Sequence, residues 1–175
     1  MIRALVLDVD GVLTDGGISL DDDGRESKRF HARDGVGIKL ALAAGWRVLF
    51  LTARNSEPAR LRARELGAEC AAGIRHKDRY LDTWLREAGI GWDEVAFVGD
   101  DLQDVRVLRR VGFPVAVNDA CAEVRAVARH VVSARGGFGA VREAVEWLLD
   151  RNGVRESVVR EFIEGDTGYA VGDAG

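Results

Sequence analysis

The chain has 175 residues, of which 47% are hydrophobic and 31% are charged, and its formal net charge is -4. This length and apolar content predict one compact domain with a buried core. Both signs of charge are scattered along the chain without a basic stripe, and the longest apolar runs are far shorter than the ~20 residues of a membrane span. We therefore expect a soluble cytoplasmic protein that binds neither nucleic acid nor membrane.

The order of the predicted elements indicates an α/β fold. Four short apolar runs rich in β-branched residues predict buried strands, at Ala4–Leu7, Val48–Leu51, Val95–Val98 and Val115–Val117. Helical spacing of apolar residues predicts helices at Gly35–Ala44, Glu57–Leu66, Lys77–Ala88, Leu102–Val111, Glu123–Ala128 and Phe138–Leu149. The alternation of strand and helix predicts a central parallel sheet with helices on both faces.

Two segments depart from this alternation. Residues 17–30 are predicted to form a β-hairpin, called the flap below, because apolar residues flank the turn-rich Asp21–Gly24. The main domain is then expected to span residues 1–150. Residues 151–175 form a C-terminal extension, predicted as a short helix and a mobile tail, since residues 165–175 are rich in Gly and Asp.

Two clusters of carboxylates follow predicted strands. Asp8 and Asp10 come directly after the first strand, and Asp100, Asp101 and Asp104 follow a later one. Carboxyl ends of parallel strands share one edge, where open α/β sheets bind ligands, so the clusters should meet there. Oxygen ligands alone favour Mg²⁺ over zinc. Capping of a helix by Asp100 or Asp101 is the alternative, although three carboxylates in five residues exceed what capping needs.

A threonine and a lysine follow the intervening elements. Thr52 ends the second strand, where its hydroxyl and the next backbone N–H groups could cradle a phosphate. Capping of the following helix is the commoner role of an isolated threonine. Lys77 opens the next helix, where the helix dipole disfavours a cation unless an anion is near. Taken alone, a solvated lysine would be the simpler explanation.

The four motifs together resemble the haloacid dehalogenase superfamily over residues 1 to about 150. In chain order they are Asp8 with Asp10, Thr52, Lys77, and Asp100 with Asp101 and Asp104. The resemblance implies a Rossmann-like fold and a Mg²⁺-dependent phosphoric monoester hydrolase. Asp8 would accept the phosphoryl group as an aspartyl-phosphate, and Asp10 would serve as the acid and then the base.

The same resemblance implies roles for the remaining motif residues. Mg²⁺ would be held by Asp8, Asp100 and the main-chain carbonyl of Asp10, with Asp101 acting through a metal-bound water. Thr52 and Lys77 would bind the equatorial oxygens of the phosphate. In addition, Asp104 would orient Lys77.

The gaps between the motifs leave no room for a cap domain, and an open site calls for closure by a partner. Within the capless group the chain looks like the 3-deoxy-D-manno-octulosonate 8-phosphate phosphatase family. The resembling segments are Asp8–Gly17, the flap, Arg33–Ile38, Arg62–Gly67 and Arg135–Glu143. The resemblance implies a homotetramer in which flaps associate and a neighbouring subunit closes the site.

The implied substrate is a small sugar-acid phosphate ester. Arg54 and Arg64 could each grip its carboxylate through paired hydrogen bonds, and Arg33 and Arg135 could do likewise. For Arg64, a solvated helix face is an equal alternative. Relatives that act on nine-carbon keto-deoxy sugar phosphates typically have Glu at the Arg54 position, so Arg54 favours the eight-carbon substrate. The chain departs from the family pattern in two places: it has Ala53 where the family usually has Gly, and its C-terminal extension is longer than usual.

Two other classes of protein share part of this pattern. A bacterial receiver domain also combines Asp, Thr and Lys on a parallel sheet, but there the acidic pair ends the first strand, the phosphoacceptor ends the third, and Thr and Lys come later. Here Thr52 and Lys77 precede the second acidic cluster. A catalytically silent tetramerisation module of the same fold is the closer alternative. Such a module need not keep Asp8, Asp10, Lys77 and Asp100 together, and their joint presence favours an active enzyme.

Overall fold

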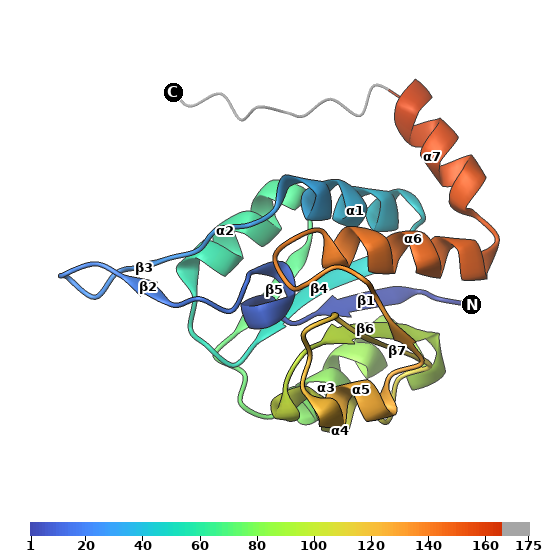
Figure 1. The fold of residues 1–175 in the computed structure, drawn as a ribbon. Helices are drawn as coiled ribbons and strands as arrows, with labels where there is room; N and C mark the ends of the chain where they lie inside the picture. Colours follow the sequence, from blue (N-terminus) through green and yellow to red (C-terminus); the bar gives the residue numbers. More distant parts are fainter. Residues whose placement is uncertain (166–175) are drawn as a thin grey trace.

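A six-stranded parallel sheet forms the centre of the computed structural model, which describes residues 1–165 (Figure 1). In spatial order the strands are β5 (Glu69–Ala72), β4 (Arg47–Thr52), β1 (Ala4–Leu7), β6 (Val95–Gly99), β7 (Phe113–Ala116) and β8 (His130–Val131). The central strand β1 pairs with β4 on one side and with β6 on the other. All four of its side chains are fully buried, which explains why it is a continuous apolar run rather than an alternating one.

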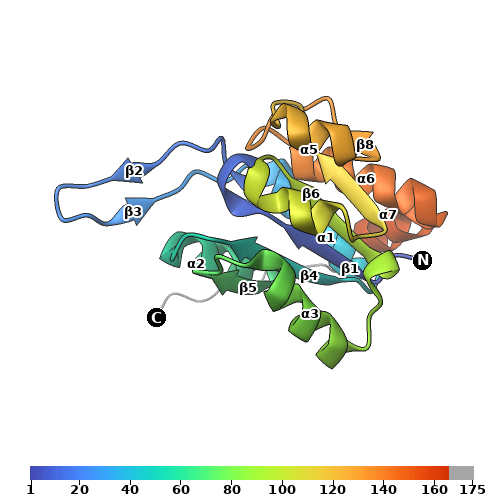
Figure 2. The same ribbon diagram turned by 90° about the horizontal axis from the view of Figure 1, so that it is seen from below.

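Helices cover both faces of the sheet (Figures 1 and 2). One face carries α1 (Ala32–Ala43), α2 (Glu57–Leu66) and α6 (Ala140–Asn152). The opposite face carries α3 (Lys77–Ala88), α4 (Val105–Leu108) and α5 (Ala122–Val127). A last helix, α7 (Arg155–Glu164), packs on the outside against α1 and α6. The predicted α/β fold with a two-sided parallel sheet is confirmed.

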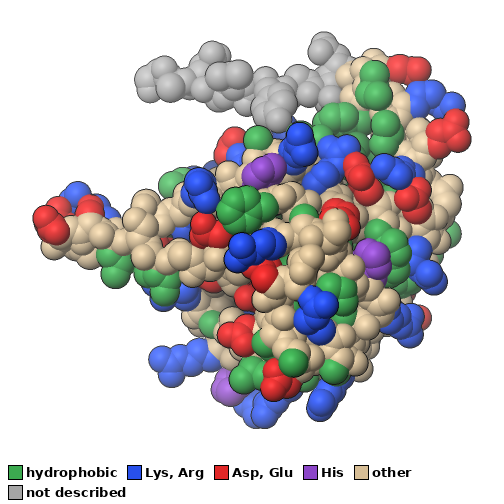
Figure 3. Space-filling view, viewed as in Figure 1, with side chains coloured by type: hydrophobic (Ala, Val, Ile, Leu, Met, Phe, Trp, Pro, Cys, Tyr) green, Lys and Arg blue, Asp and Glu red, His purple; other side chains and the backbone are tan. Residues whose placement is uncertain are grey.

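The flap projects from the body of the molecule as a narrow arm (Figure 3). Its antiparallel strands are short, β2 (Ser19–Leu20) and β3 (Glu26–Ser27). The predicted hairpin is thus present, and no inserted cap domain interrupts residues 1–165. Within the same part of the chain, no helix is long and apolar enough to cross a membrane.

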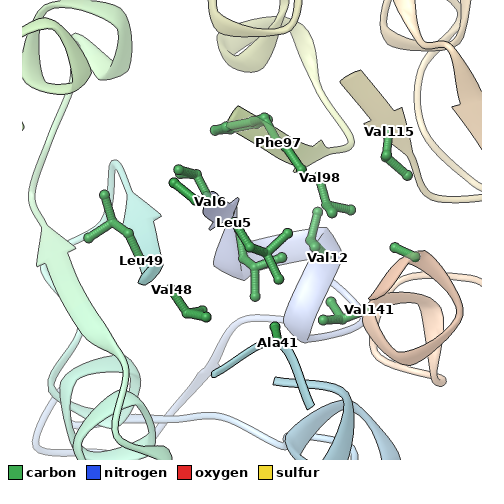
Figure 4. Packing of buried hydrophobic residues seen from close by; sticks show 14 of the residues in the cluster. Leu5, Val6, Val12, Ala41, Val48, Leu49, Phe97, Val98, Val115 and Val141 are labelled. Atoms are coloured by element: carbon green, nitrogen blue, oxygen red, sulfur yellow. The ribbon is translucent and has the colours of Figure 1, made fainter. Parts of the chain in front are cut away.

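The core lies in two layers, one on each face of the sheet (Figure 4). Leu5 and Val48 are paired in register and point toward Ala41 of α1, while Val6 and Phe97 point to the opposite face. Successive residues of a strand alternate between faces, so a single apolar run supplies both layers.

Close packing of α1 against α6 depends on two residues of α1. The Asp34 carboxylate is 1% exposed and accepts hydrogen bonds from the backbone N–H groups of Gly139 (3.3 Å) and Arg142 (2.8 Å), at the start of α6. Gly37 faces the same helix, and a Cβ atom there would lie 2.9 Å from the Arg142 Cα. Packing of α1 on α6 therefore accounts for Asp34 and Gly37 of the Arg33–Ile38 segment.

Some predicted elements differ from the structure. The helix predicted at Leu102–Val111 is wrong in form: a 3-10 turn (Leu102–Asp104) precedes the single turn of α4. This tighter turn returns the Asp104 carboxylate to the backbone N–H of Asp100. The kinked turn at Val9–Leu13, in which Asp10 and Gly11 have non-helical backbone angles, and the two-residue strand β8 were not predicted.

At the C-terminal end, α6 continues to Asn152 and α7 follows it. The division into residues 1–150 and 151–175 stays a prediction. The tail predicted to be mobile lies, except for Gly165, outside the described residues.

Candidate active site

The carboxyl ends of β1, β4 and β6 meet where the chain reverses direction across the sheet. From β1 the chain proceeds to β4 and β5, and then returns to β6 on the other side of β1. Such a switch point opens a crevice that binds ligands. Asp8 follows β1, Thr52 ends β4, Asp100 follows β6, and Lys77 begins α3. The structure thus gathers residues that are separated by as much as 92 positions in the sequence.

Lys77 lies between two buried carboxylates. Its ammonium is 2.8 Å from Asp8 Oδ1 and 2.7 Å from Asp104 Oδ1, and all three side chains are at most 1% exposed. Burial alone would lower the pKa of Lys77, but the charges of Asp8 and Asp104 outweigh this effect and raise it. Lys77 is therefore a cation. The other oxygen of Asp104 accepts a hydrogen bond from Asp100 N (3.1 Å), which occupies both oxygens of this carboxylate.

Asp8 and Asp100 carry buried oxygens that have no hydrogen-bond partner among the described residues. These atoms are Asp8 Oδ2 and Asp100 Oδ1. Carboxylate oxygens of Asp8, Asp100 and Asp104 lie within 4.8 Å of one another. Burial raises the pKa of Asp8 to about 6, with Lys77 opposing and Asp104 adding to the shift. Burial, followed by the charges of Asp8 and Asp104, raises the pKa of Asp100 to about 8.

These two carboxylates fit a hard divalent cation. Clustered carboxylates repel one another unless a positive charge joins them, and free oxygen atoms are what Mg²⁺ coordinates. Since Lys77 and a backbone N–H already occupy Asp104, the oxygens left for a metal belong to Asp8 and Asp100.

Asp10 lies on the flap side of the same crevice. Its Oδ2 accepts a hydrogen bond from the Thr52 hydroxyl (3.2 Å), and Thr52 Oγ1 in turn accepts one from Arg54 N (3.1 Å). Its Oδ1 forms an ion pair with the Lys28 ammonium, which the flap supplies. The Lys28 side chain is fully buried. Sequence reasoning missed this lysine.

Glu26 connects the flap with the loop after β4. Its Oε1 accepts from the Lys28 ammonium (3.0 Å) and from Arg54 Nε (3.0 Å), and its Oε2 accepts from the Ser56 hydroxyl (2.6 Å). Ser56 also caps the N-terminus of α2. The available signal was the spacing of these residues, because Lys28 directly follows β3 and residues two apart in an extended chain point to the same face.

The other residues predicted for the site lie at its margin or on the surface. Asp101 is exposed, and its carboxylate accepts from Leu102 N (2.7 Å), which is the capping contact considered as an alternative. Arg135 pairs with Asp119 (3.2 Å) and its side chain is 71% exposed. Arg33 and Arg64 are exposed and form no ion pair within residues 1–165.

The glycine-rich loop after β8 packs on the loop that carries Asp10. Gly137 N donates to Val12 O (3.0 Å), and a Cβ atom on Gly136 would overlap the carbonyl of Gly11. This close approach explains Gly136 and Gly137 of the Arg135–Glu143 segment. The loop therefore holds the chain around Asp10 in place.

Comparison with known proteins agrees with this geometry. The family model of haloacid dehalogenase-like hydrolases matches residues 72–143. A 3-deoxy-D-manno-octulosonate 8-phosphate phosphatase of Haemophilus influenzae is 37% identical over 87% of this chain and 85% of its own length. The corresponding Escherichia coli protein is 41% identical over 85% of this chain and 79% of its own.

A solved structure gives the same result. The phosphatase of this name from Moraxella catarrhalis, in complex with a magnesium ion, a phosphate ion and a KDO molecule, has a TM-score of 0.88 and 33% identity. The match covers 92% of this chain and 93% of that one. The chain belongs to the 3-deoxy-D-manno-octulosonate 8-phosphate phosphatase family of haloacid dehalogenase-like hydrolases.

Proposed function

We propose that this protein is a Mg²⁺-dependent phosphatase that hydrolyses 3-deoxy-D-manno-octulosonate 8-phosphate or a closely similar sugar-acid phosphate. The observation that carries this proposal is the buried cluster of Asp8, Lys77 and Asp100, in which Asp8 Oδ2 and Asp100 Oδ1 are unpartnered. Family membership supplies the substrate class.

In the first half-reaction, the Asp8 carboxylate attacks phosphorus and the bond from phosphorus to the sugar oxygen breaks. Asp10 donates a proton to that leaving oxygen, which gives the free sugar acid and an aspartyl-phosphate on Asp8. In the second half-reaction, Asp10 takes a proton from the water that attacks the same phosphorus. Inorganic phosphate leaves and the Asp8 carboxylate is restored.

Residues around Asp8 stabilise the charge on the phosphoryl group during both transfers. Thr52 and Lys77 bind its equatorial oxygens, and Asp104 holds Lys77 in place. Asp8, Asp100 and the main-chain carbonyl of Asp10 would hold Mg²⁺, with Asp101 acting through a water. The bound ion would neutralise the repulsion between the Asp8 carboxylate and the phosphate.

Arg54 is the best placed of the four arginines to meet the sugar carboxylate. Its Nε donates a hydrogen bond to Glu26, which orients the guanidinium toward the flap. The two terminal nitrogens form no hydrogen bond within residues 1–165 and remain available for a paired contact with a carboxylate. Arg64, Arg33 and Arg135 are proposed as outer contacts.

The working form proposed is a cytoplasmic homotetramer in which a neighbouring subunit closes the open site. The flap supports this, because Ile18 and Leu20 are 56% and 58% exposed on a projecting arm (Figure 3). Apolar side chains on such an arm are typical of an association surface.

The test is phosphate release from a panel of eight-carbon and nine-carbon keto-deoxy sugar phosphates and ordinary sugar phosphates, with Mg²⁺ or EDTA. We expect Mg²⁺-dependent turnover, fastest on the eight-carbon acid, that falls by at least about 10³-fold in Asp8→Asn. Faster turnover of the nine-carbon acid would reassign the substrate. Absence of turnover on every ester would favour the silent tetramerisation module.

A further inference from the structure

Lys28 is the flap residue that contacts Asp10, and its surroundings are unusual for a lysine. Its side chain is fully buried, although most residues of the arm are exposed. A buried ammonium is stable only when it is paired and hydrogen-bonded. Lys28 meets this requirement through Asp10 Oδ1 and Glu26 Oε1.

We infer that Lys28 is a positioning residue for the proton transfers of Asp10, and that Glu26 holds Lys28 in place. This inference rests on the proposed function. Lys28 occupies Asp10 Oδ1, and Thr52 contacts Oδ2 at 3.2 Å. The ion pair fixes one oxygen, so the carboxylate cannot rotate freely about its terminal bond. The more weakly held Oδ2 is then the atom that exchanges a proton with the leaving oxygen and with water.

Glu26 makes the arrangement depend on the position of the flap. Glu26 belongs to the flap and accepts hydrogen bonds from Lys28, also in the flap, and from Arg54 and Ser56 in the loop between β4 and α2. When the flap lies in place, these contacts set Asp10 and the proposed carboxylate-binding Arg54 together. A flap that swings away withdraws Lys28 from Asp10 and Glu26 from Arg54. Positioning of the acid is thereby coupled to the flap.

A comparison of two leaving groups separates this role from a general structural one. A sugar alkoxide is a strong base and needs a proton as it leaves, whereas p-nitrophenolate is a weak base and does not. Because both esters share the later hydrolysis of the aspartyl-phosphate, the two are compared by kcat/KM, which covers the steps up to departure of the leaving group. For Lys28→Met we expect kcat/KM on the sugar-acid phosphate to fall about 10- to 100-fold. On p-nitrophenyl phosphate, kcat/KM should change less than about threefold. Lys28→Arg, which keeps a cation, should recover part of the loss.

Arg29→Met is the matched control. Arg29 is the next residue of the same hairpin, but its side chain is 74% exposed and pairs with Asp15 (3.0 Å) outside the site. We expect this variant to stay within about twofold of wild type on both esters, as exposed ion pairs contribute little. Equal losses of activity on both esters in Lys28→Met, or no loss on either, would overturn the positioning role. Turnover by the wild-type protein would still support the proposed function in that case.

The rate of tryptic cleavage in the flap is a second test, and it does not depend on turnover. Arg25 in the hairpin turn is 78% exposed and offers a cleavage site. Cleavage there should be faster in Lys28→Met and in Glu26→Gln than in Arg29→Met. If Lys28→Met does not fold, Glu26→Gln takes its place in the kinetic test. Unchanged cleavage in both variants would show that these residues do not hold the flap. Absence of wild-type turnover on both esters would overturn the proposed function together with the positioning role.

Discussion

The Asp8 carboxylate and the Lys77 ammonium lie 2.8 Å apart with both side chains only 1% exposed. Water contributes little to such a pair, so each charge depends on the other and on Asp104 for its stability. The proposed nucleophile therefore belongs to a buried charge network that includes Asp100. Changes to one member should affect folding and metal binding as well as turnover.

Replacement of Lys77 by Met should destabilise the metal-free protein by about 3 to 5 kcal/mol, because buried carboxylates lose their cation. Added Mg²⁺ should recover part of this loss by neutralising Asp8 and Asp100. The measurement is urea unfolding of Lys77→Met in EDTA and in Mg²⁺. Arg79→Met, which removes an exposed cation of the same helix, is the control and should stay within about 0.5 kcal/mol. Equal stability of the two variants in EDTA would contradict the network.

Stability of the metal-free protein should fall as the pH rises from about 4 to 8. The folded-state pKa values of Asp8 and Asp100, about 6 and about 8, lie above the usual 3.8. In this window the folded state therefore binds more protons than the unfolded state, and the free energy of unfolding decreases with pH. Carboxylates with lowered pKa values, such as Glu26, contribute to stability throughout this window, and that contribution is lost only when the pH falls below it.

Mg²⁺ must displace these protons, so its affinity should increase up to about pH 8. Melting temperatures in EDTA and in Mg²⁺ at pH 6, 7 and 8 check both statements. The stabilisation by Mg²⁺ should grow with pH, and Asp100→Asn should largely remove that growth. A melting temperature in EDTA that rises from pH 6 to pH 8 would show that the carboxylates do not titrate in this window.

The residues that could be placed from the sequence are those whose position follows from the sheet. Asp8 and Asp100 each follow a strand, and ends of neighbouring parallel strands meet whatever the loops do. Lys28 could not be placed in this way, because its contact with Asp10 depends on the angle at which the flap leaves the body. That angle is set by the contacts of Glu26 with Arg54 and Ser56, which no local pattern specifies.

Asp101 offers a test of two roles that one carboxylate can combine. It caps the 3-10 turn through Leu102 N, and it is proposed to reach Mg²⁺ through water. Asparagine caps as well as aspartate does, so Asp101→Asn should leave the melting temperature unchanged and raise the Mg²⁺ concentration for half-maximal turnover severalfold. Asp101→Ala should do the same and also destabilise the protein by about 1 kcal/mol. An unaltered Mg²⁺ requirement in both variants would leave the cap as its only role.

Arg54 should determine recognition of the substrate carboxylate. Loss of a paired guanidinium–carboxylate contact costs about 1.5 to 3 kcal/mol, so Arg54→Gln should lower kcat/KM for the sugar-acid phosphate about 10- to 100-fold. A sugar phosphate without a carboxylate never makes that contact, and its kcat/KM should change less than about threefold. Arg60→Gln, at the start of the adjacent α2, is the control, because Arg60 pairs only with Glu57 and Asn55 within the described chain. If Arg54→Gln lowered kcat/KM equally for both substrates, the role of Arg54 would be its contact with Glu26 alone. The carboxylate would then be bound by Arg64, Arg33 or Arg135.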